Sequence, residues 1–338
     1  MSGIRTISVS EEDDGQRLDR WLKKRVPELP YALAQKLIRK GAIRVDGKKA
    51  QTDSRLLAGQ EIRLPPLEDR PERQKTGSGH VARTNDPDYI RKMVIYDDGD
   101  VVALNKPGDI ASQGGGGVER HIDGLLEHLQ DKKGRRPRLI HRLDRETSGV
   151  LLCARSSEAV RRLGASFRDR YAQKIYWAVV VPAPDEQEGT INAPLVKATG
   201  AQKDRMVVDE EHEDSKIAMT DFMVLERAGK KAAFVAFMPR TGRTHQIRVH
   251  AADVLGCPIL GDTKYGGSKA RLTGLDLSPR LHLHARRLVL RHPLKKEMLD
   301  ITAPLSPEMA KTLKTLGFDP VLADEITAGY KPFIDRAN

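Results

Sequence analysis

The feature that most constrains the fold is a stretch without hydrophobic periodicity, over residues 65–88. It is rich in proline, glycine and charged residues, and includes the run Gly77-Ser-Gly79, a composition typical of a flexible linker. The 338-residue chain is therefore predicted to form two folded units. We expect a small module over residues 1–64, a larger domain over residues 89–317 and a loosely held C-terminal tail over residues 318–338.

The composition excludes several classes of protein. Hydrophobic residues make up 39% of the chain, which is enough for a packed core and argues against wholesale disorder. No apolar run approaches the roughly 18 residues of a membrane span, and the first residues lack the apolar segment of a secretory signal. Cys153 and Cys257 are too far apart for a CxxC motif or a disulfide framework. We expect a cytoplasmic protein without membrane association, and nothing demands more than a monomer.

The charge balance favours a polyanionic partner. Lys and Arg total 58 against 47 Asp and Glu, so the formal net charge is +11. Nucleic acid is the leading candidate partner, although many ordinary enzymes have a solvated basic surface. Aromatic residues are only 4% of the chain, so binding of single strands through rows of stacked rings is not expected.

The N-terminal module is predicted to contain two helices followed by a small sheet. Apolar residues recur at helical spacing over residues 18–26 and 31–40, and Gly41 stands where a glycine would end the second helix. Short strands are expected at residues 43–45 and 61–64, with a tight Asp-Gly turn after the first.

A cluster of bases covers the end of the second predicted helix and the hairpin after it. Its members are Lys36, Arg39, Lys40, Arg44, Lys48 and Lys49. Bases there would neutralise RNA phosphates and release counterions, whereas compensation of the helix dipole would need fewer of them. Residues 13–64 resemble an S4-type RNA-binding domain. The matching segments are Gln16-Arg-Leu-Asp19, Lys36 to Gly41, Ile43-Arg-Val-Asp-Gly47 and Ala58-Gly-Gln-Glu-Ile62.

The larger domain mixes strands with helices and is predicted to be an α+β domain with a substantial sheet. Strands are expected over residues 101–104, 174–181 and 232–238. Helices are expected over residues 121–130, 157–170 and 244–255, and another begins at Pro307 after a Ser306 cap.

The most informative stretch is the charged loop His141-Arg-Leu-Asp-Arg-Glu-Thr-Ser-Gly149, which lies between two apolar strands. Functional groups are often placed on loops with rigid flanks. Asp144 stands between Arg142 and Arg145, and a nearby guanidinium would keep its carboxylate ionised as a nucleophile or base. A structural salt bridge between Asp144 and one of these arginines explains the same pattern.

Two further segments place charged or aromatic residues next to a strand. In residues 239–250, Arg248 lies one turn inside a predicted helix, where it could reach a carboxylate from another segment. Lys174 and Tyr176 share one face of a predicted strand. The alternatives are a phosphate-binding surface that includes Arg243 and Arg248 without a catalytic part, and a core or edge position for Tyr176.

Three other motifs are not supported by the sequence. The glycine run 114–117 lacks the Lys-Ser/Thr of a phosphate-binding loop. His282 and His284 share one face of a strand, but no third ligand is near in sequence, so a metal site is not expected. No Gly-x-Ser-x-Gly elbow is present.

Residues 89–305 resemble the RluA family of pseudouridine synthases, isomerases that convert uridines of RNA to pseudouridine. The loop 141–149 matches the catalytic signature of the family, and the other matching segments follow in the family's order. They are Leu104-Asn-Lys-Pro107, Gln173-Lys-Ile-Tyr176, Thr241 to His250 and Gly261 to Gly266. An S4-like module ahead of such a domain is similar to the arrangement in the branch that modifies large-subunit (23S) ribosomal RNA. Within that branch, Ala193-Pro-Leu-Val-Lys197 and Arg205-Met-Val-Val favour the RluC type.

The resemblance implies a mixed, mainly antiparallel sheet and a reaction without cofactor or metal. Asp144 would be the essential carboxylate at a flipped-out uridine. Tyr176 would stack on the flipped base, Arg142 would fill the space that it leaves, and Arg248 would pair with Asp144 and hold it ionised. Gln113 stands where many relatives have a histidine, which puts RNA contacts there in doubt, though not catalysis.

Two alternatives stay open at this point. The first is a non-catalytic S4-type RNA-binding or ribosome-assembly factor, in which the N-terminal module is the working part. The second is the same class of enzyme acting on tRNA. The expected partner is large-subunit ribosomal RNA, either free or within an assembly intermediate.

Overall fold

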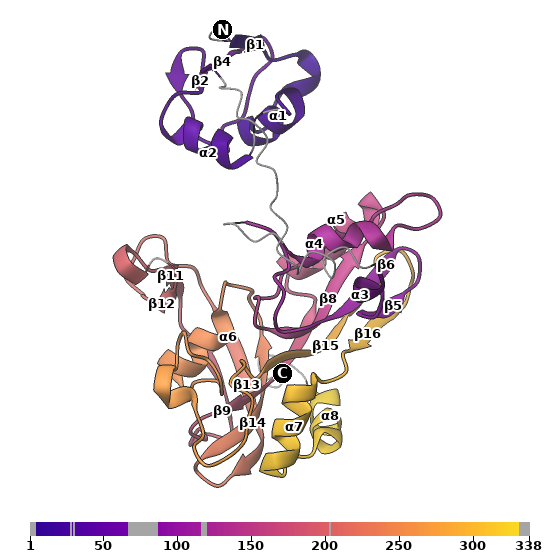
Figure 1. The fold of residues 1–338 in the computed structure, drawn as a ribbon, viewed down its shortest axis with the longest axis vertical. Helices are drawn as coiled ribbons and strands as arrows, with labels where there is room; N and C mark the ends of the chain where they lie inside the picture. The colour runs from indigo at the N-terminus through magenta and orange to yellow at the C-terminus, as the bar shows by residue number, and fades with distance from the viewer. Residues whose placement is uncertain are drawn as a thin grey trace, which may run out of the picture. The chain divides into compact units, whose positions relative to one another are not determined.

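The computed structural model describes most of both predicted units (Figure 1). The described residues are 5–27, 29, 31–66, 87–115, 120–202 and 204–330. The chain divides into two compact units, residues 1–77 and residues 78–338. Most of the linker predicted over residues 65–88 lies outside the described residues. Within the described ranges, no helix is long and apolar enough to cross a membrane.

The N-terminal unit combines a four-stranded sheet, in the order β1-β4-β2-β3, with two helices. The elements are β1 (Arg5–Ser8), α1 (Leu18–Arg25), α2 (Tyr31–Arg39), β2 (Arg44–Val45), β3 (Lys48–Lys49) and β4 (Glu61–Leu64). Leu18, Trp21 and Leu22 of α1 are buried in one core with Ile38 of α2 and Ile62 of β4. This core explains the helical spacing of the apolar residues in the sequence.

The turns of this unit have the predicted chemistry. Gly41 has a φ of 68° just after α2, and Asp46 and Gly47 have φ values of 48° and 72° between β2 and β3. Glycine and aspartate tolerate this left-handed conformation better than most residues. The sequence did not predict β1, because its four residues include one apolar side chain, Ile7, and its partner β4 lies far along the chain.

The larger unit is built on a ten-stranded sheet. Eight strands follow the order β10-β13-β14-β9-β15-β8-β6-β5, while β16 pairs with β15 and β7 pairs with β8. The strands are β5 (Val94–Asp97), β6 (Val101–Lys106), β7 (Arg138–Leu139), β8 (Ser148–Ala154), β9 (Gln173–Val180), β10 (Glu188–Asn192), β13 (Met219–Ala228), β14 (Ala232–Pro239), β15 (Leu283–Arg291) and β16 (Met298–Thr302). The strands β11 (Leu195–Lys197) and β12 (Met206–Val208) form a separate antiparallel hairpin.

One parallel pairing, between β15 and β8, joins two antiparallel halves of this sheet, and we call it the seam. It consists of His284 opposite Ser148 and Ala285 opposite Gly149. Gly149 has a φ of 108°, and a Cβ atom at this position would collide with the backbone of Ala285. A glycine is therefore required here. The predicted mixed, mainly antiparallel sheet is confirmed.

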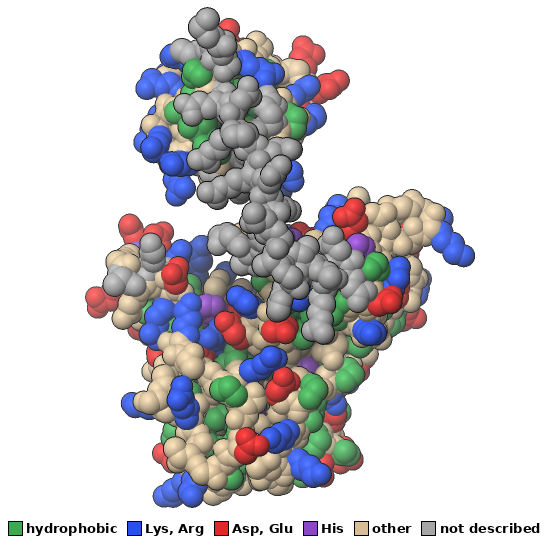
Figure 2. Space-filling model, in the orientation of Figure 1, with side chains coloured by type: hydrophobic (Ala, Val, Ile, Leu, Met, Phe, Trp, Pro, Cys, Tyr) green, Lys and Arg blue, Asp and Glu red, His purple; other side chains and the backbone are tan. Residues whose placement is uncertain are grey.

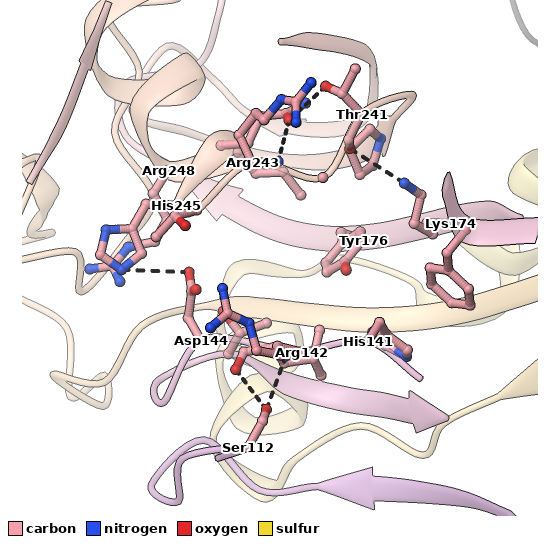
Figure 3. A pocket seen from close by; sticks show the side chains of 18 of the residues that line it. Ser112, His141, Arg142, Asp144, Lys174, Tyr176, Thr241, Arg243, His245 and Arg248 are labelled. Atoms are coloured by element: carbon pink, nitrogen blue, oxygen red, sulfur yellow. Dashed lines mark hydrogen bonds and ion pairs between the residues drawn. The ribbon is translucent and has the colours of Figure 1, made fainter. Parts of the chain in front are cut away.

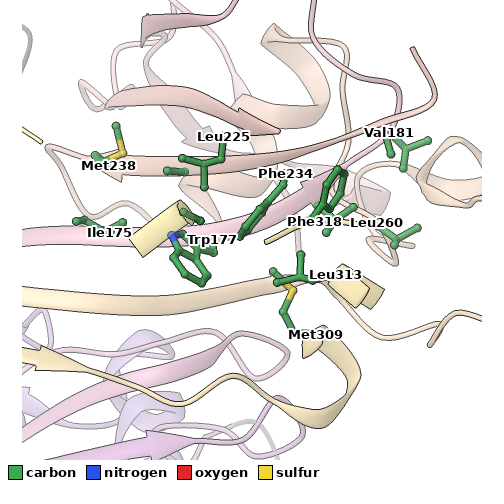
Figure 4. Close-up of a cluster of buried hydrophobic side chains, with 14 of the residues drawn as sticks. Ile175, Trp177, Val181, Leu225, Phe234, Met238, Leu260, Met309, Leu313 and Phe318 are labelled. Atoms are coloured by element: carbon green, nitrogen blue, oxygen red, sulfur yellow. The ribbon is translucent and has the colours of Figure 1, made fainter. Parts of the chain in front are cut away.

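Alternation along β9 builds two cores, one on each face of the sheet. Ile175, Trp177 and Val179 pack on one face, where the ring centroid of Trp177 lies 5.1 Å from that of Phe234 (Figure 4). Ala178 belongs to the core on the other face. Lys174 and Tyr176 therefore share a face, as the sequence predicted.

The helices lie around the sheet. They are α3 (Pro87–Arg91), α4 (Ile122–Leu125), α5 (Ser157–Arg168), α6 (Gln246–Val249), α7 (Pro307–Leu316) and α8 (Pro320–Ala328). Ser306 caps α7 as predicted, since its side chain accepts a hydrogen bond from the Met309 N–H at 3.2 Å. The helix predicted over residues 244–255 is instead the short α6, followed by a π-helical turn over His250–Val254.

The prediction of a loosely held tail over residues 318–338 is wrong for residues 318–330. Phe318, Ala323 and Tyr330 belong to the same core as Trp177 (Figure 4). The apolar residues of α8 do not fall on one face of the helix, and several of them stay exposed. The sequence therefore shows little sign that this segment packs on the core. Its docking depends on a few buried contacts that only the folded sheet provides. Residues 331–338 lie outside the described residues.

Candidate active site

A cavity of about 820 Å³ brings together residues from both halves of the sheet (Figure 3). It is lined by the loops around residues 112 and 144, the end of α5, the start of β9 and the segment that leads into α6. Asp144, Arg142, Tyr176, Arg243 and Arg248, all singled out in the sequence, line it together. Segments that are distant in the sequence thus form a single site.

The charges around the cavity are strongly one-sided. Among the described residues, its lining contains a single carboxylate, that of Asp144, and eight Lys or Arg side chains. The bases are Arg142, Arg145, Arg168, Arg170, Lys174, Arg240, Arg243 and Arg248. This arrangement suits a polyanionic substrate.

Two polar side chains, those of Ser112 and Lys106, hold the backbone of the loop that contains Asp144. Ser112 donates a hydrogen bond from Oγ to the Leu143 carbonyl at 2.7 Å and accepts one from the Leu143 N–H at 3.0 Å. Lys106 is fully buried, and its Nζ donates to the carbonyls of Pro107, Ile110 and Arg145. Burial lowers the pKa of Lys106 to about 8, although the nearby carboxylates oppose the shift. Asp144 is therefore held between two anchored neighbours.

Arg248 does not form the pair with Asp144 that the resemblance implied. Its Nε and Nη2 donate to both oxygens of Asp262 at 2.8 Å, and its Nη1 donates to Glu146 at 3.2 Å. Arg248 and Asp262 are both buried, so a bidentate pair is the geometry that satisfies both charges. Burial opposes the charged form of Arg248, but the carboxylates of Asp262, Asp144 and Glu146 raise its pKa. The guanidinium thus influences Asp144 only through space.

The Asp144 side chain is partly exposed to the cavity, with 26% of its surface accessible. Its ionic neighbour is His245, whose Nε2 lies 4.0 Å from Oδ2 (Figure 3). That distance is longer than a hydrogen bond. The carboxylate is thus accessible to a substrate and is not consumed by a structural salt bridge, the alternative that the sequence left open for its two neighbouring arginines.

Tyr176 and Lys174 of β9 point into the same cavity. Burial raises the pKa of the Tyr176 hydroxyl, and the charge of Asp144 adds to the effect, so this phenol stays protonated at neutral pH. Lys174 donates to the Thr241 carbonyl at 3.3 Å. Burial, with a contribution from Arg170, lowers the pKa of Lys174 to about 8.

The remaining predicted residues lie at the mouth of the cavity. Arg142 and Gln113 are exposed there. Arg243 is also exposed, and its Nε donates to the Ile217 carbonyl at 3.1 Å. Exposed guanidinium groups beside a cavity are suited to binding phosphates.

Sequence reasoning missed three residues that shape the site: Lys106, Ser112 and His245. Lys106 and His245 lie within motifs that were quoted for the resemblance, but their partners come from other segments. Ser112 had no distinguishing pattern around it. No sequence signal identifies such partners, because they meet only when the two halves of the sheet come together.

The histidines that were weighed as metal ligands have hydrogen-bonding roles in the core. His282 contacts the Thr312 hydroxyl at 2.7 Å and His284 contacts the Ser148 hydroxyl at 2.8 Å. In the part of the chain that the structure describes, no group of three or more His, Cys, Asp or Glu side chains is placed to hold a metal ion.

The basic cluster of the N-terminal unit is exposed at the end of α2 and in the β2–β3 hairpin (Figure 2). Its predicted RNA-binding members, all exposed, are Lys36, Arg39, Lys40, Arg44 and Lys48. Arg44 also donates to the carbonyls of Gly41 and Gly47, which ties the hairpin to the end of the helix. The cluster is thus a surface available to a partner.

Comparison with known proteins agrees with this reading of the site. Residues 100–253 match the model of the family described as RNA pseudouridylate synthase, and residues 16–62 match the S4 domain. Among solved structures, human RNA pseudouridylate synthase domain containing 4 is 28% identical with a TM-score of 0.58. The match covers 69% of this chain and 96% of that one.

Curated relatives extend the likeness to nearly the whole chain. Ribosomal large subunit pseudouridine synthase C of Vibrio parahaemolyticus is 33% identical, over 93% of this chain and 98% of the relative. The protein of the same name from Escherichia coli is also 33% identical, over 93% of this chain and 97% of its own. The chain belongs to the RNA pseudouridylate synthase family, with an S4 domain at its N-terminal end. The resemblance identified in the sequence is confirmed.

Proposed function

We propose that this protein isomerises uridines of large-subunit (23S) ribosomal RNA to pseudouridine in the cavity, with Asp144 as the essential carboxylate. The observation that carries the proposal is that, among the described residues, the lining contains one carboxylate and eight bases. The relatives are named ribosomal large subunit pseudouridine synthase C, which supports the choice of RNA.

The size of the cavity suits one nucleotide. Ligand cavities are commonly about 300 to 1,000 Å³, and the observed 820 Å³ is open enough to admit a uridine that has left its helix. Flipping a base out of its stack costs a few kcal/mol. The bases at the cavity mouth offset part of that cost by binding the phosphates on either side.

The reaction is a rearrangement in which no atom is lost. The bond between N1 of uracil and C1′ of ribose breaks, the uracil turns, and a bond forms between C5 and C1′. The hydrogen on C5 leaves as a proton, and N1 gains one. Asp144 is the group in the lining that is able either to attack C1′ or to remove the 2′ proton, because it is the one carboxylate that lines the cavity among the described residues.

Tyr176 and Arg142 are placed to hold the nucleotide. The ring of Tyr176 lines the interior of the cavity, where it can stack on the flipped uracil, and its hydroxyl stays protonated at neutral pH. Arg142 is exposed at the mouth, where its guanidinium can enter the space that the base leaves. These roles follow the family resemblance and agree with the positions of both side chains.

The N-terminal unit would provide affinity and site selection on the RNA. Replacing Lys36, Arg39 and Lys40 together with glutamine is expected to weaken RNA binding by about tenfold to a hundredfold and to lower the slope of log K against log salt by about two. The rate at saturating RNA should stay within about twofold, because none of these residues lines the cavity. Filter binding at several salt concentrations, combined with single-turnover rates, measures both quantities.

A matched triple variant serves as the control for this prediction. Lys230, Lys231 and Lys314 are exposed bases of the larger unit that do not line the cavity. Their replacement with glutamine changes the net charge equally and should leave the salt slope nearly unchanged. Equal loss of affinity in the two triple variants would show that only overall charge matters.

The proposed function is tested by mapping pseudouridines in ribosomal RNA with carbodiimide-stop sequencing, in a strain without this protein and in its parent. We expect specific stops in the large-subunit RNA to disappear and to return when the protein is supplied again. If stops disappeared from tRNA instead, the substrate would be tRNA and not ribosomal RNA. An unchanged map would contradict the proposal, and the alternative of an RNA-binding factor without enzymatic activity would then stand. The proposal is for a monomer that acts on the ribosomal RNA either free or within an assembly intermediate.

A further inference from the structure

A chain of polar contacts leads from the β11–β12 hairpin to the carboxylate of Asp144. The backbone N–H of Met206 in β12 donates to the Tyr265 hydroxyl at 3.0 Å. The same hydroxyl lies 2.7 Å from Nδ1 of His245. On the other side of the ring, Nε2 of His245 lies 4.0 Å from Oδ2 of Asp144 (Figure 3).

The contact from Met206 favours one tautomer of the imidazole. A tyrosine hydroxyl has one proton to donate, and the N–H of Met206 can only donate to it. With one lone pair taken by Met206, the hydroxyl of Tyr265 still has its own proton to donate, and Nδ1 of His245 is the acceptor that lies beside it. A neutral imidazole that accepts at Nδ1 carries its proton on Nε2. In that tautomer the Nε2–H group of His245 faces Asp144.

The backbone holds His245 in an unusual conformation that directs its ring. Its φ is 53°, in the left-handed region that residues with a Cβ seldom adopt. The residue precedes α6, and its carbonyl accepts from the Val249 N–H at 3.0 Å. The next side chain, that of buried Gln246, accepts from Thr241 and from the N–H of Arg243. Strain of this kind tends to occur at functional sites, where neighbouring contacts maintain it.

The surroundings of His245 favour its neutral form. Burial is the main cause that lowers the pKa of His245, the cations oppose protonation further, and the carboxylates favour it. The titratable and charged groups around the ring are Asp144 and Glu146 of the loop 141–149, Arg248 of α6, and Lys264 and Tyr265 of the segment that follows Asp262. Arg205 of the hairpin lies against the Tyr265 ring, with its guanidinium carbon 5.0 Å from the ring centroid.

We propose that His245 is a positioning residue for Asp144, and that Tyr265 keeps the proton of its imidazole on the nitrogen that faces the carboxylate. Through Met206, the β11–β12 hairpin sets this arrangement. The inference rests on the proposed function, in which Asp144 is the reacting carboxylate. The inference adds His245 as a residue that controls the orientation of the Asp144 carboxylate.

A neutral N–H group would orient one oxygen of Asp144 and leave the other for the ribose. The separation of 4.0 Å needs to shorten by about 1 Å when RNA binds, as catalytic hydrogen bonds often do. An imidazolium would instead form an ion pair with the carboxylate and withdraw it from the substrate. Activity should therefore fall when His245 becomes protonated at acidic pH.

The test uses Tyr265→Phe in the full chain, which keeps the ring and removes only the hydroxyl. Without the donor to Nδ1, the neutral imidazole loses a stabilising hydrogen bond, so the pKa of His245 should rise by about one unit. The acid limb of the single-turnover rate then moves to higher pH by the same amount, and the rate at neutral pH falls by about tenfold at unchanged RNA affinity. Tyr96→Phe is the control, because it removes a phenol that binds Asp98 outside the cavity.

Nitrogen NMR of the imidazoles reads the tautomer directly and needs no RNA. The signal of His245 is assigned by its absence in His245→Gln, which also places an N–H donor near the Nε2 position without a titrating ring. We expect the Nε2–H form in the wild-type protein, a mixture of tautomers in Tyr265→Phe, and a rate without the acid limb in His245→Gln. His245→Leu, which has no donor, should be slower than His245→Gln.

Two results would overturn the inference: an Nδ1–H tautomer or an imidazolium in the wild-type protein at neutral pH, or a Tyr265→Phe variant with the wild-type pH profile. Failure of the proposed function is a separate outcome. A wild-type protein that forms no pseudouridine would contradict the function, while the NMR spectra would still decide which nitrogen of His245 holds the proton.

Discussion

Replacing Asp144 with asparagine is expected to abolish pseudouridine formation, with a fall in the single-turnover rate of at least about ten-thousand-fold. Asparagine has the same size and can keep the contacts of the loop, but it has no negative charge with which to attack C1′ or accept a proton. Because Ser112 and Lys106 fix the loop through backbone groups, the fold should be unaffected. RNA affinity should stay within about twofold, because the bases of the lining are retained.

The rate is measured by release of label from C5 of the uridines, and RNA affinity is measured separately. Asp169→Asn is the matched control, since Asp169 is an exposed acid just after α5 that does not line the cavity. It should react at the wild-type rate. If Asp144→Asn retained more than a small fraction of the activity, another group would have to perform the chemistry, and the assignment of the site would be wrong.

Replacing Arg248 with methionine is expected to destabilise the larger unit by about 3–5 kcal/mol. Arg248 is 4% exposed and its partner Asp262 is 1% exposed, so the variant leaves a carboxylate buried without its cation. For a unit of this size, such a loss lowers the melting temperature by about 10 °C. Differential scanning calorimetry of the full chain measures the shift in the transition of the larger unit.

An exposed ion pair provides the comparison for Arg248. Arg280 pairs with Glu308 at 3.0 Å, and the side chains are 54% and 34% exposed. Arg280→Met should cost less than about 1 kcal/mol, because water solvates the remaining carboxylate. Equal destabilisation by the two substitutions would contradict the structural role assigned to Arg248. Restoration of stability in the double variant Arg248→Met, Asp262→Asn would support it.

The sequence singled out residues that share one cavity, but it did not predict how they are arranged there. Asp144, Tyr176 and Arg248 stand in motifs, and the structure brings them to one cavity. The partner of Arg248 was predicted incorrectly, because a motif indicates that an arginine is needed without showing which carboxylate it binds. Asp262 lies fourteen residues further along, and the pair forms only after α6 packs against the turn that contains it.

The elements of the fold were predicted well where local pattern determines them and poorly where tertiary contacts do. The helices α1 and α2 and the Asp-Gly turn follow from spacing and turn chemistry. The strand β1 has one apolar residue and the helix α8 has apolar residues without a clear amphipathic spacing, so the stability of both comes from distant partners. The left-handed backbone of His245 could not be predicted from the sequence either, because histidine adopts a positive φ far less readily than glycine does.

The seam has a consequence for how accurately the active site is built. Asp144 is attached to the half of the sheet that contains β8, whereas Tyr176 and His245 are attached to the other half. The parallel contact between the halves consists of two residue pairs, one of which needs Gly149. A slip of one residue in that register would displace Asp144 by about 3.3 Å, while productive geometry tolerates errors of about 0.5 Å. The position of Asp144 relative to Tyr176 and His245 therefore depends on strand register. Gly149, which has no side chain, allows the close contact that fixes this register.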